Sequence, residues 1–547
     1  MTTAIDPAAE QAPDTPAGRI KRYWNLLVGY GLRVYSWVRV RPEWILVSGF
    51  LLVLLAVSIH QRTRMLGGQF WMDEAITVGI ASHPLSQIPH IMRQDGSPPL
   101  FYMLLHVWIQ LFGDGEKHTH ALSVVFGALT IPVSYWGARK ILNKRAAVFA
   151  ALLFATNAFL TSYSQETRMY ALMALLGLVT TIGFVGGFVL RRRRYVALFT
   201  VAQTLMIYTH SWGLFFGMAS FVCVVVLYLT AEQADRRYFI RDALCAYVAV
   251  AVLYAPWLPT FLFQSAHTAA PWDARPRLGL FVQIGQGIMG GDSLAIAAFA
   301  VTVYGCWALL GRAQRRTREA RVVFVLFGLA ALTFTFAWCA SQITPAWVLR
   351  YFAPTVGPVL LLLAAGLARA RVLGVLALLI ACTAILHPAQ YAPANKSNMR
   401  QISGELAPLL HRGDLVIVGQ PEQTPLAYYY VSLSGLQWAN TMGRVADPTY
   451  MDWVNAMQRY RAAQPARVLP PILNSLRVGQ QVLYIRPLTE GYSNWDAPWT
   501  QLIRFRSAQW GQILADDKQF KQVAWAPQYY PGACCVANSA VLYKKVS

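Results

Sequence analysis

The sequence predicts a mainly α-helical, polytopic membrane protein with a small soluble α/β domain at its C-terminal end. Three observations support this prediction: few charged residues, basic residues gathered in short loops between apolar runs, and a change of composition near Ala389. The 547 residues are 56% hydrophobic and 13% charged, with a mean hydropathy of +0.38. Soluble chains carry about 25% charged residues, so these values exclude soluble, disordered, collagen-like and coiled-coil classes.

Eleven apolar runs are candidate membrane spans, although several are shorter than the ~20 residues that cross the hydrocarbon core. A further apolar run, Pro98 to Phe112, breaks the alternation of the loops if it crosses the membrane. We interpret it as a helix in the interface, and a count of twelve or thirteen spans stays open. The eleven runs lie at about residues 44–59, 120–138, 147–163, 169–190, 195–209, 212–230, 239–259, 293–311, 321–341, 347–368 and 371–387.

The distribution of basic residues predicts the orientation in the membrane. One set of alternate loops, together with the N-terminal segment 1–43, holds 24 Lys and Arg, whereas the opposite set holds 8. Because cytoplasmic loops carry the excess of Lys and Arg, the basic set is expected in the cytoplasm. The net charge of +22 is therefore assigned to topology, and no nucleic-acid partner is expected. The stretch from Lys21 to Arg41 is expected to lie on the membrane surface as an amphipathic helix.

This orientation divides the chain into three parts. An N-terminal segment, 1–43, precedes a membrane domain, 44–388, whose large first outer loop is 60–119. Residues 389–547 form the third part, an extracytoplasmic soluble α/β domain. In this part the stretches 414–419, 482–486 and 540–543 have the pattern of buried strands, and the stretches 399–411, 449–463 and 499–514 have that of helices. Cys534 and Cys535 lie outside the predicted spans and are able to oxidise there.

Polar groups at the outer ends of the spans are the candidate functional residues, because ionisable side chains close to hydrocarbon are costly. Five outer loops bring them to a similar depth, which suits a group-transfer site at a membrane surface. The elements are Asp73-Glu74, Asp95-Gly-Ser97-Pro-Pro, Gln165-Glu166-Thr-Arg168, His210-Ser211 and Arg350-Tyr351.

Each element also has a structural interpretation. Asp73 is either a partly desolvated general base or the N-cap of the helix that follows. Glu166 and Arg168 are either site residues or an ion pair that joins two spans. His210 is either a site residue or an interfacial imidazole bonded to backbone, and Arg350 either binds a lipid phosphate or extends to the headgroups. His118 and His120 give only a weak indication of a metal site.

These residues resemble a known family, the GT-C membrane glycosyltransferases. The similarity is to the branch that contains protein O-mannosyltransferases, the aminoarabinose transferase of lipid A and many bacterial homologues. It covers most of the chain, and the landmarks are Asp73-Glu74, the segment Asp95 to His106, Gln165 to Ala171, Tyr208 to Gly213, Arg350 to Pro354, and Asn398 to Ser403 with Arg412 to Val418 in the soluble part.

The resemblance implies a polyprenyl-phosphate-linked sugar donor and an extracytoplasmic active site in the plasma (inner) membrane. On this basis Asp73 is expected to be the general base of a single inverting displacement, and Glu74, assigned with it to catalysis, to orient hydroxyl groups. The leaving phosphate is assigned to Arg168, His210 and Arg350, and the sugar or acceptor to Asp95, Ser97, Glu166 and Tyr351.

The sequence also indicates part of the substrate and cofactor requirements. No trefoil-like repeat is apparent, so a glycan or lipid acceptor is expected rather than a protein. The sugar is expected to be mannose, or else a pentose such as arabinose. No required metal is indicated, although a divalent ion is not excluded. The alternatives are a transporter or lipid flippase, which calls for charged or broken elements at mid-membrane, and a receptor or assembly subunit that presents the soluble domain.

Overall fold

The computed structural model describes residues 23, 25, 42–268, 273, 275–311, 314–383, 396–489, 496–527 and 537–547. The chain forms two compact units, Met1–Ala56 and Val57–Ser547. The predicted surface helix between Lys21 and Arg41 lies almost entirely outside the described residues, as do Cys534 and Cys535.

Helices dominate the structure up to residue 383, but fewer than eleven are long enough to cross a membrane. By length and composition, five described helical segments qualify, or six if the bent pair α12 (Gln233–Tyr254) and α13 (Leu258–His267) forms one span with its 68° break. The five are α2 (Pro42–Arg62), α6 (Glu116–Ile141), α9 with its π-helical end (Tyr170–Val189), α16 (Arg318–Ile343) and the 3-10 helix η3 (Leu349–Thr355) with α17 (Val356–Arg369).

Most of the other predicted runs fold as shorter helices in the described part of the chain. Several are 17 residues long or less, below the ~20 residues that cross hydrocarbon, and α7 is separated from α8 at Asn157. These helices are α7 (Lys144–Thr156), α8 (Ala158–Tyr163), α10 (Arg193–Thr209), α11 (Gly213–Leu229), α15 (Asp292–Trp307) and α18 (Arg371–Cys382). A further short helix, α14 (Leu280–Met289), lies outside the eleven predicted runs.

The loop 60–119 folds into three helices that build one wall of the site. They are α3 (Met72–Ala81), α4 (Ile88–Asp95) and α5 (Leu100–Phe112). The run Pro98 to Phe112, predicted as an interfacial helix, forms the 13-residue α5. Glycine permits one close approach here: a Cβ on Gly79 of α3 would lie 1.9 Å from the Thr449 carbonyl oxygen of the C-terminal region. This contact seats α3 directly against the sheet-bearing part of the chain.

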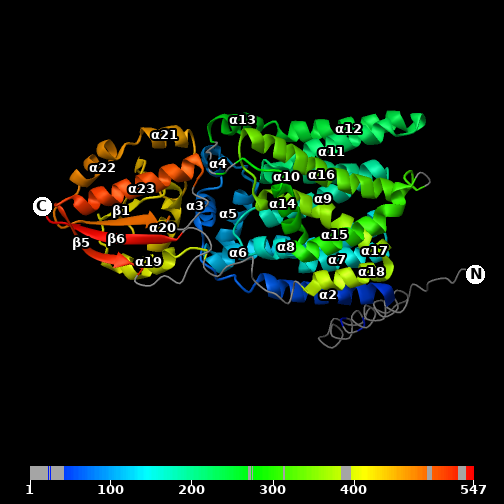
Figure 1. Ribbon diagram of the computed structural model, residues 1–547, viewed down its shortest axis with the longest axis horizontal. Helices are drawn as coiled ribbons and strands as arrows, with labels where there is room; N and C mark the ends of the chain where they lie inside the picture. The colour runs from blue at the N-terminus through cyan, green and yellow to red at the C-terminus, as the bar shows by residue number, and fades with distance from the viewer. Residues whose placement is uncertain are drawn as a thin grey trace, which may run out of the picture. The chain divides into compact units, whose positions relative to one another are not determined.

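The C-terminal region contains a six-stranded mixed sheet (Figure 1). Its order is β3-β2-β1-β4-β6-β5, with β1 parallel to both neighbours and the other pairs antiparallel. The three predicted strands correspond to β1, β4 and β6. The strands are β1 (Leu415–Val418), β2 (Gln437–Asn440), β3 (Gly443–Arg444), β4 (Gln481–Pro487), β5 (Phe520–Ala526) and β6 (Asn538–Lys545).

Helices cover both faces of this sheet, because alternate residues of β1 point to opposite sides. Val416 and Val418 pack with α19 (Met399–Leu406) and α20 (Thr424–Val431). Leu415 and Ile417 pack with α22 (Pro465–Asn474) and α23 (Pro498–Asp516) on the other face. Figure 1 shows α22 and α23 on one side of the strands and α19 on the other. A short helix, α21 (Ala456–Ala462), precedes α22.

Candidate active site

A cavity of about 920 Å³ lies where α3, α4, the ends of several apolar helices and the sheet-bearing region meet. Its volume falls in the range of small-molecule binding sites. Seven of the nine residues that the sequence assigns to a site line it: Asp73, Asp95, Ser97, Arg168, His210, Arg350 and Tyr351. The structure thus brings together residues that are up to 278 positions apart in the sequence.

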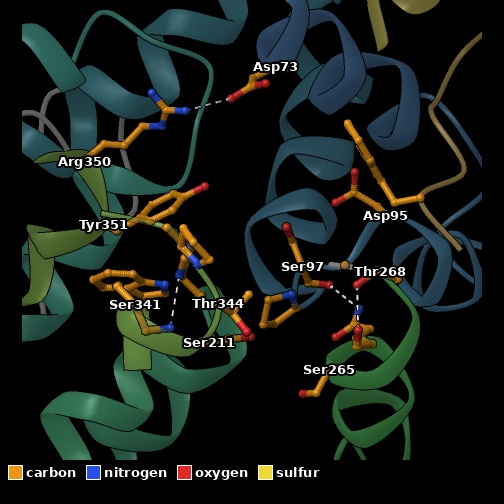
Figure 2. A pocket seen from close by; sticks show the side chains of 18 of the residues that line it. Asp73, Asp95, Ser97, Ser211, Ser265, Thr268, Ser341, Thr344, Arg350 and Tyr351 are labelled. Atoms are coloured by element: carbon orange, nitrogen blue, oxygen red, sulfur yellow. Dashed lines mark hydrogen bonds and ion pairs between the residues drawn. The ribbon is translucent and has the colours of Figure 1, made fainter. Parts of the chain in front are cut away.

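Asp73 lies in the first turn of α3 rather than before it. The helix begins at Met72, so the alternative interpretation of Asp73 as an N-cap does not hold. Glu74 makes the capping contact instead, because its Oε2 accepts the backbone N–H of Trp71 at 3.2 Å. The side chain of Asp73 is left to face the cavity, where Oδ2 lies 3.9 Å from Arg168 Nη2. The same oxygen lies 3.8 Å from Arg350 Nη2, and Figure 2 draws this second contact.

Arg168 is held rigidly by neighbouring oxygens. Its Nη1 donates to Thr77 Oγ1 at 2.7 Å, to the Asp73 carbonyl oxygen at 3.2 Å and to the Tyr102 hydroxyl at 3.4 Å. Burial lowers the pKa of the guanidinium, but the nearby tyrosines and Asp73 outweigh this effect and raise it. Arg168 is therefore a fixed cation whose position is set by α3 and α5.

Arg350 and Tyr351 enter the cavity from the 3-10 turn η3, on the wall opposite Asp95 and Ser97 (Figure 2). This turn packs closely on α9, since a Cβ on Gly177 would lie 2.4 Å from the Pro354 carbonyl oxygen. The guanidinium carbon of Arg350 lies 5.2 Å from the centroid of the Trp71 ring, within cation–π range. The aromatic neighbour and Asp73 thus aim Arg350 at the cavity from two sides.

His210 follows the last residue of α10 and is almost fully buried. Burial, together with the charges of Arg168 and Arg350, lowers its pKa to about 3. The imidazole is therefore neutral at ordinary pH, and because its Nδ1 accepts the Trp212 backbone N–H at 3.1 Å, the proton is placed on Nε2. His210 can thus donate one hydrogen bond but brings no positive charge, unlike the two arginines. The two alternative interpretations of His210 are therefore compatible, since it is hydrogen-bonded to backbone and also lines the cavity.

Asp95 and Ser97 lie on either side of Gly96, whose φ of +100° ends α4 in the left-handed conformation. Burial raises the pKa of the Asp95 carboxyl to about 6, although Arg168 works in the opposite direction. Gln264 of α13 fixes the turn by donating from Nε2 to the Met92 and Ser97 carbonyl oxygens, at 2.7 and 3.2 Å. The turn therefore presents a weakly acidic carboxyl and a hydroxyl to the cavity.

Two predicted site residues do not line the cavity: Glu74, which the sequence assigns to catalysis, and Glu166, which it assigns to the sugar or acceptor. One helical residue turns the side chain by about 100°, so Glu74 points away from the face that carries Asp73. Its Oε1 instead receives three donors, Lys396 Nζ at 2.8 Å, His120 Nε2 at 2.7 Å and the Thr167 N–H at 2.8 Å. Burial raises the pKa of Glu74, but Lys396 and His120 outweigh it and lower the value to about 2. Burial also raises the pKa of Glu166, to about 7.

Several cavity residues come from the C-terminal region and were not predicted. They are Gln420, Glu422, Trp453, Trp499 and Thr500. The sequence held one signal for the first two: they directly follow the predicted strand 414–419, and the carboxyl ends of parallel strands commonly form ligand sites. Within the described ranges, no group of three or more His, Cys, Asp and Glu side chains is arranged to hold a metal ion. His120, part of the weak metal indication, contacts Glu74 and the Leu66 carbonyl oxygen.

Comparison with known proteins places the fold. A family model for dolichyl-phosphate-mannose-protein mannosyltransferase matches residues 96–263. The apo structure of ArnT from Cupriavidus metallidurans is 15% identical, with a TM-score of 0.61 over 90% of this chain and 98% of that chain. Its structure with undecaprenyl phosphate gives 15% identity and a TM-score of 0.58, over 91% and 98%. The apo oligosaccharyltransferase of Archaeoglobus fulgidus is 12% identical, with a TM-score of 0.53 over 89% of this chain and 75% of that chain. No curated protein matched the sequence.

The chain is thus a multi-pass membrane protein with the fold of the two ArnT structures, which is the fold that the resemblance to GT-C membrane glycosyltransferases predicts. This finding confirms the resemblance drawn from Asp73-Glu74 and the later landmarks. Within that class, the similarity to ArnT runs through nearly the full length of both chains, so it includes the C-terminal α/β region as well as the helices.

Proposed function

We infer that the protein transfers a sugar from a polyprenyl-phosphate donor to an acceptor hydroxyl group. The observation that carries this inference is the meeting of one carboxylate with two arginines in a cavity: Asp73 lies within 4 Å of both Arg168 and Arg350. A base and a phosphate-binding pair are the two functions that such a transfer needs. The ArnT structure with undecaprenyl phosphate supports the choice of donor, because it has the same fold.

The proposed reaction is a single displacement with inversion. The acceptor oxygen forms a bond to the anomeric carbon while Asp73 takes the hydroxyl proton. The bond from that carbon to the phosphate oxygen breaks, and its electron pair leaves with the polyprenyl phosphate. Asp73 later releases the proton to water. The products are the glycosylated acceptor and free polyprenyl phosphate.

The leaving phosphate needs charge stabilisation more than it needs a proton, since its pKa is already low. Arg168 and Arg350 supply fixed positive charge and planar donors that suit phosphate oxygens. His210 adds a neutral N–H donor at the same wall. This cationic wall, defined by Arg168, His210 and Arg350, is where the proposal places the phosphate. Because it already supplies positive charge, the proposal requires no metal ion.

Asp95, Ser97 and Tyr351 also line the cavity, so we assign them to the sugar or the acceptor. The sugar is proposed to be mannose or a pentose, and the acceptor a glycan or lipid. Lipid-linked donors serve compartments that lack nucleotide sugars, so we place the cavity and residues 389–547 on the extracytoplasmic side of the plasma membrane. The 3:1 bias of Lys and Arg between the two sets of loops supports this orientation.

The test is transfer by the purified, full-length protein in detergent with radiolabelled undecaprenyl-phosphate mannose or arabinose. Membrane extract supplies the acceptor, and release of undecaprenyl phosphate is followed in parallel. Asp73→Asn is expected to lower transfer by about 10²-fold or more, because a positioned base contributes that much. The matched control is Asp114→Asn, at an exposed position of the same loop. Transfer by Asp73→Asn within tenfold of the unchanged protein would reject the assigned base.

A further inference from the structure

The C-terminal sheet has a topological switch point, and this point faces the cavity. Strand β1 is parallel to β2 on one side and to β4 on the other. The helices that follow β1 and precede β4, α20 and α22, lie on opposite faces of the sheet. Open α/β sheets bind ligands in the crevice outside the carboxyl end of the strand where the order reverses. The residues that line the cavity directly after β1 are Gln420 and Glu422.

Glu422 is a buried acid, and only one of its two carboxylate oxygens has hydrogen-bond partners among the described residues. The residue is only 4% exposed. Oε1 accepts from Gln420 Nε2 at 2.8 Å and from Trp499 Nε1 at 3.1 Å. Oε2 is buried and has no hydrogen-bond partner among the residues that the structure describes. A buried carboxylate oxygen calls for a donor, and this one belongs to a residue that lines the cavity.

Two tryptophans complete the same wall. The Trp453 and Trp499 rings are 5.3 Å apart and inclined at 51°, and both residues line the cavity. Trp453 is fixed from the membrane side, because its backbone N–H donates to the Gln94 carbonyl oxygen of α4 at 3.0 Å. The Tyr460 ring lies 5.2 Å from the Trp499 ring, and its hydroxyl is hydrogen-bonded to Thr441. Contacts from the membrane part and from the C-terminal region thus hold the two tryptophans in place.

The chemistry of this wall differs from that of the cationic wall. The only ionisable side chain among Gln420, Glu422, Trp453 and Trp499 is acidic. Burial raises the pKa of this carboxyl, and the charge of Asp73 acts in the same direction. A phosphate or carboxylate is disfavoured here. An uncharged ligand with several hydroxyl groups fits, because a hydroxyl can donate to Glu422 Oε2 and an apolar ring face can lie on a tryptophan ring.

We propose that Glu422 and Trp453, at the switch point of the C-terminal sheet, form a binding subsite for an uncharged carbohydrate, the acceptor end of the cavity. The proposal rests on the function inferred above and makes it specific: the acceptor is a sugar, and the soluble domain selects it. In this proposal the donor phosphate lies at the cationic wall, and the sugar acceptor lies at the wall formed by Glu422 and Trp453. Asp73 lies between the two.

The experiment measures binding, so it does not depend on turnover. Full-length protein in detergent, saturated with undecaprenyl phosphate, is titrated with methyl glycosides of mannose, glucose, galactose and arabinose while saturation-transfer NMR is recorded. At least one glycoside is expected to bind. Glu422→Gln keeps the shape and the acceptor at Oε1 but loses the charge, and it should weaken that binding about tenfold, as loss of a charge-assisted hydrogen bond predicts. Trp453→Ala should weaken it about fivefold or more.

Matched controls come from the same domain. Glu405→Gln on α19 and Trp525→Ala on β5 change residues that do not line the cavity, and both should bind the glycoside as the unchanged protein does. If Glu422→Gln fails to fold, Trp453→Ala carries the test alone. Binding of none of the four glycosides, or equal binding by Trp453→Ala and the unchanged protein, overturns the proposal.

The outcome is separable from that of the proposed function. If glycoside binding ignores Glu422 and Trp453 while Asp73→Asn abolishes transfer, the subsite is wrong and the transferase inference stands. If glycoside binding depends on both residues but no sugar moves from the lipid donor, the wall binds carbohydrate and the transferase inference fails.

Discussion

Replacing Lys396 by Met should destabilise the protein strongly, because it removes the main counter-charge of a buried carboxylate. Glu74 and His120 are fully buried, and Lys396 is 3% exposed. Lys396 Nζ donates to Glu74 Oε1 and to the Gln165 carbonyl oxygen, both at 2.8 Å. After the change, Glu74 keeps His120 and the Thr167 N–H but loses its ammonium partner.

The magnitude follows from the shift in the pKa of Glu74. The fall from 4.5 to about 2, at ~1.4 kcal/mol for each pH unit, corresponds to about 3 kcal/mol of folding free energy. Breaking a buried ion pair by removing one partner costs about 3–5 kcal/mol, so the two values agree. His120 contributes part of the lowering, and we therefore expect Lys396→Met to lose about 2–4 kcal/mol.

The sign of the pH dependence is fixed by the direction of this shift. A carboxyl whose pKa is lowered on folding stabilises the fold above its unfolded pKa, and this stabilisation disappears as the pH falls through the folded value. The contribution is therefore complete above about pH 4.5 and is lost toward pH 2. The gap in melting temperature between the unchanged protein and Lys396→Met should be widest at neutral pH and narrow on acidification.

The assay is thermal unfolding of purified protein in detergent at a series of pH values. Lys521→Met, at an exposed position on β5, is the matched control and should melt near the unchanged protein. The double change Glu74→Gln with Lys396→Met should recover part of the loss, because no uncompensated charge is left buried. If Lys396→Met melts with the control, or if the double variant is no better than the single one, the ion-pair reasoning is refuted.

Three further predictions concern the cavity and its junction. Arg350→Lys should weaken undecaprenyl phosphate binding about tenfold, since an ammonium lacks the guanidinium fork, whereas Arg444→Lys on exposed β3 should not; equal affinities would exclude Arg350 from the phosphate site. Burial raises the pKa of Asp95 from 3.8 to about 6, so the unchanged protein loses stability as the pH rises through this interval. The melting temperature of Asp95→Asn should therefore rise relative to that of the unchanged protein between pH 4 and 7. A difference that stays constant with pH would contradict this. Gly79→Val should lower the yield and the melting temperature, because its Cβ would meet the Thr449 carbonyl. The control Gly404→Ala, with open space around its Cβ, should be tolerated. A stable Gly79→Val would show that α3 and the C-terminal region can separate without cost.

The sequence was sufficient to predict the membrane-facing part of the site. Asp73, Arg168 and Arg350 are polar residues next to apolar runs, and the cost of placing charge there makes them visible without a structure. Their convergence in one cavity follows from their shared depth at the ends of the helices. The roles of Glu74 and Asp73 could not be separated in this way, because the exact start of α3 decides which of two adjacent acids faces the cavity.

The part that could not be predicted depends on contacts between distant segments. Lys396 is an ordinary lysine in the sequence, and only the packed structure places it 2.8 Å from Glu74, 322 positions away. Trp499 likewise has no local pattern that marks it, and the place of Glu422 after a predicted strand becomes informative only once the order of the strands is known. Hydropathy also cannot tell a full span from a shorter apolar helix buried among others, so the bounds of runs such as 147–163, which the structure divides into α7 and α8, could not be predicted.

The attachment of Lys396 has a practical consequence for how the polypeptide can be divided. After the last apolar helix, α18, the structure describes Thr383 and then resumes at this lysine, which is bound directly behind the helix that carries Asp73. The Gly79–Thr449 contact adds a second point of attachment that needs no peptide linkage. Two separately expressed fragments, joined by these and further non-covalent contacts such as the Arg400–Glu116 ion pair, should therefore reassemble into a working protein when the break is made between Cys382 and Lys396.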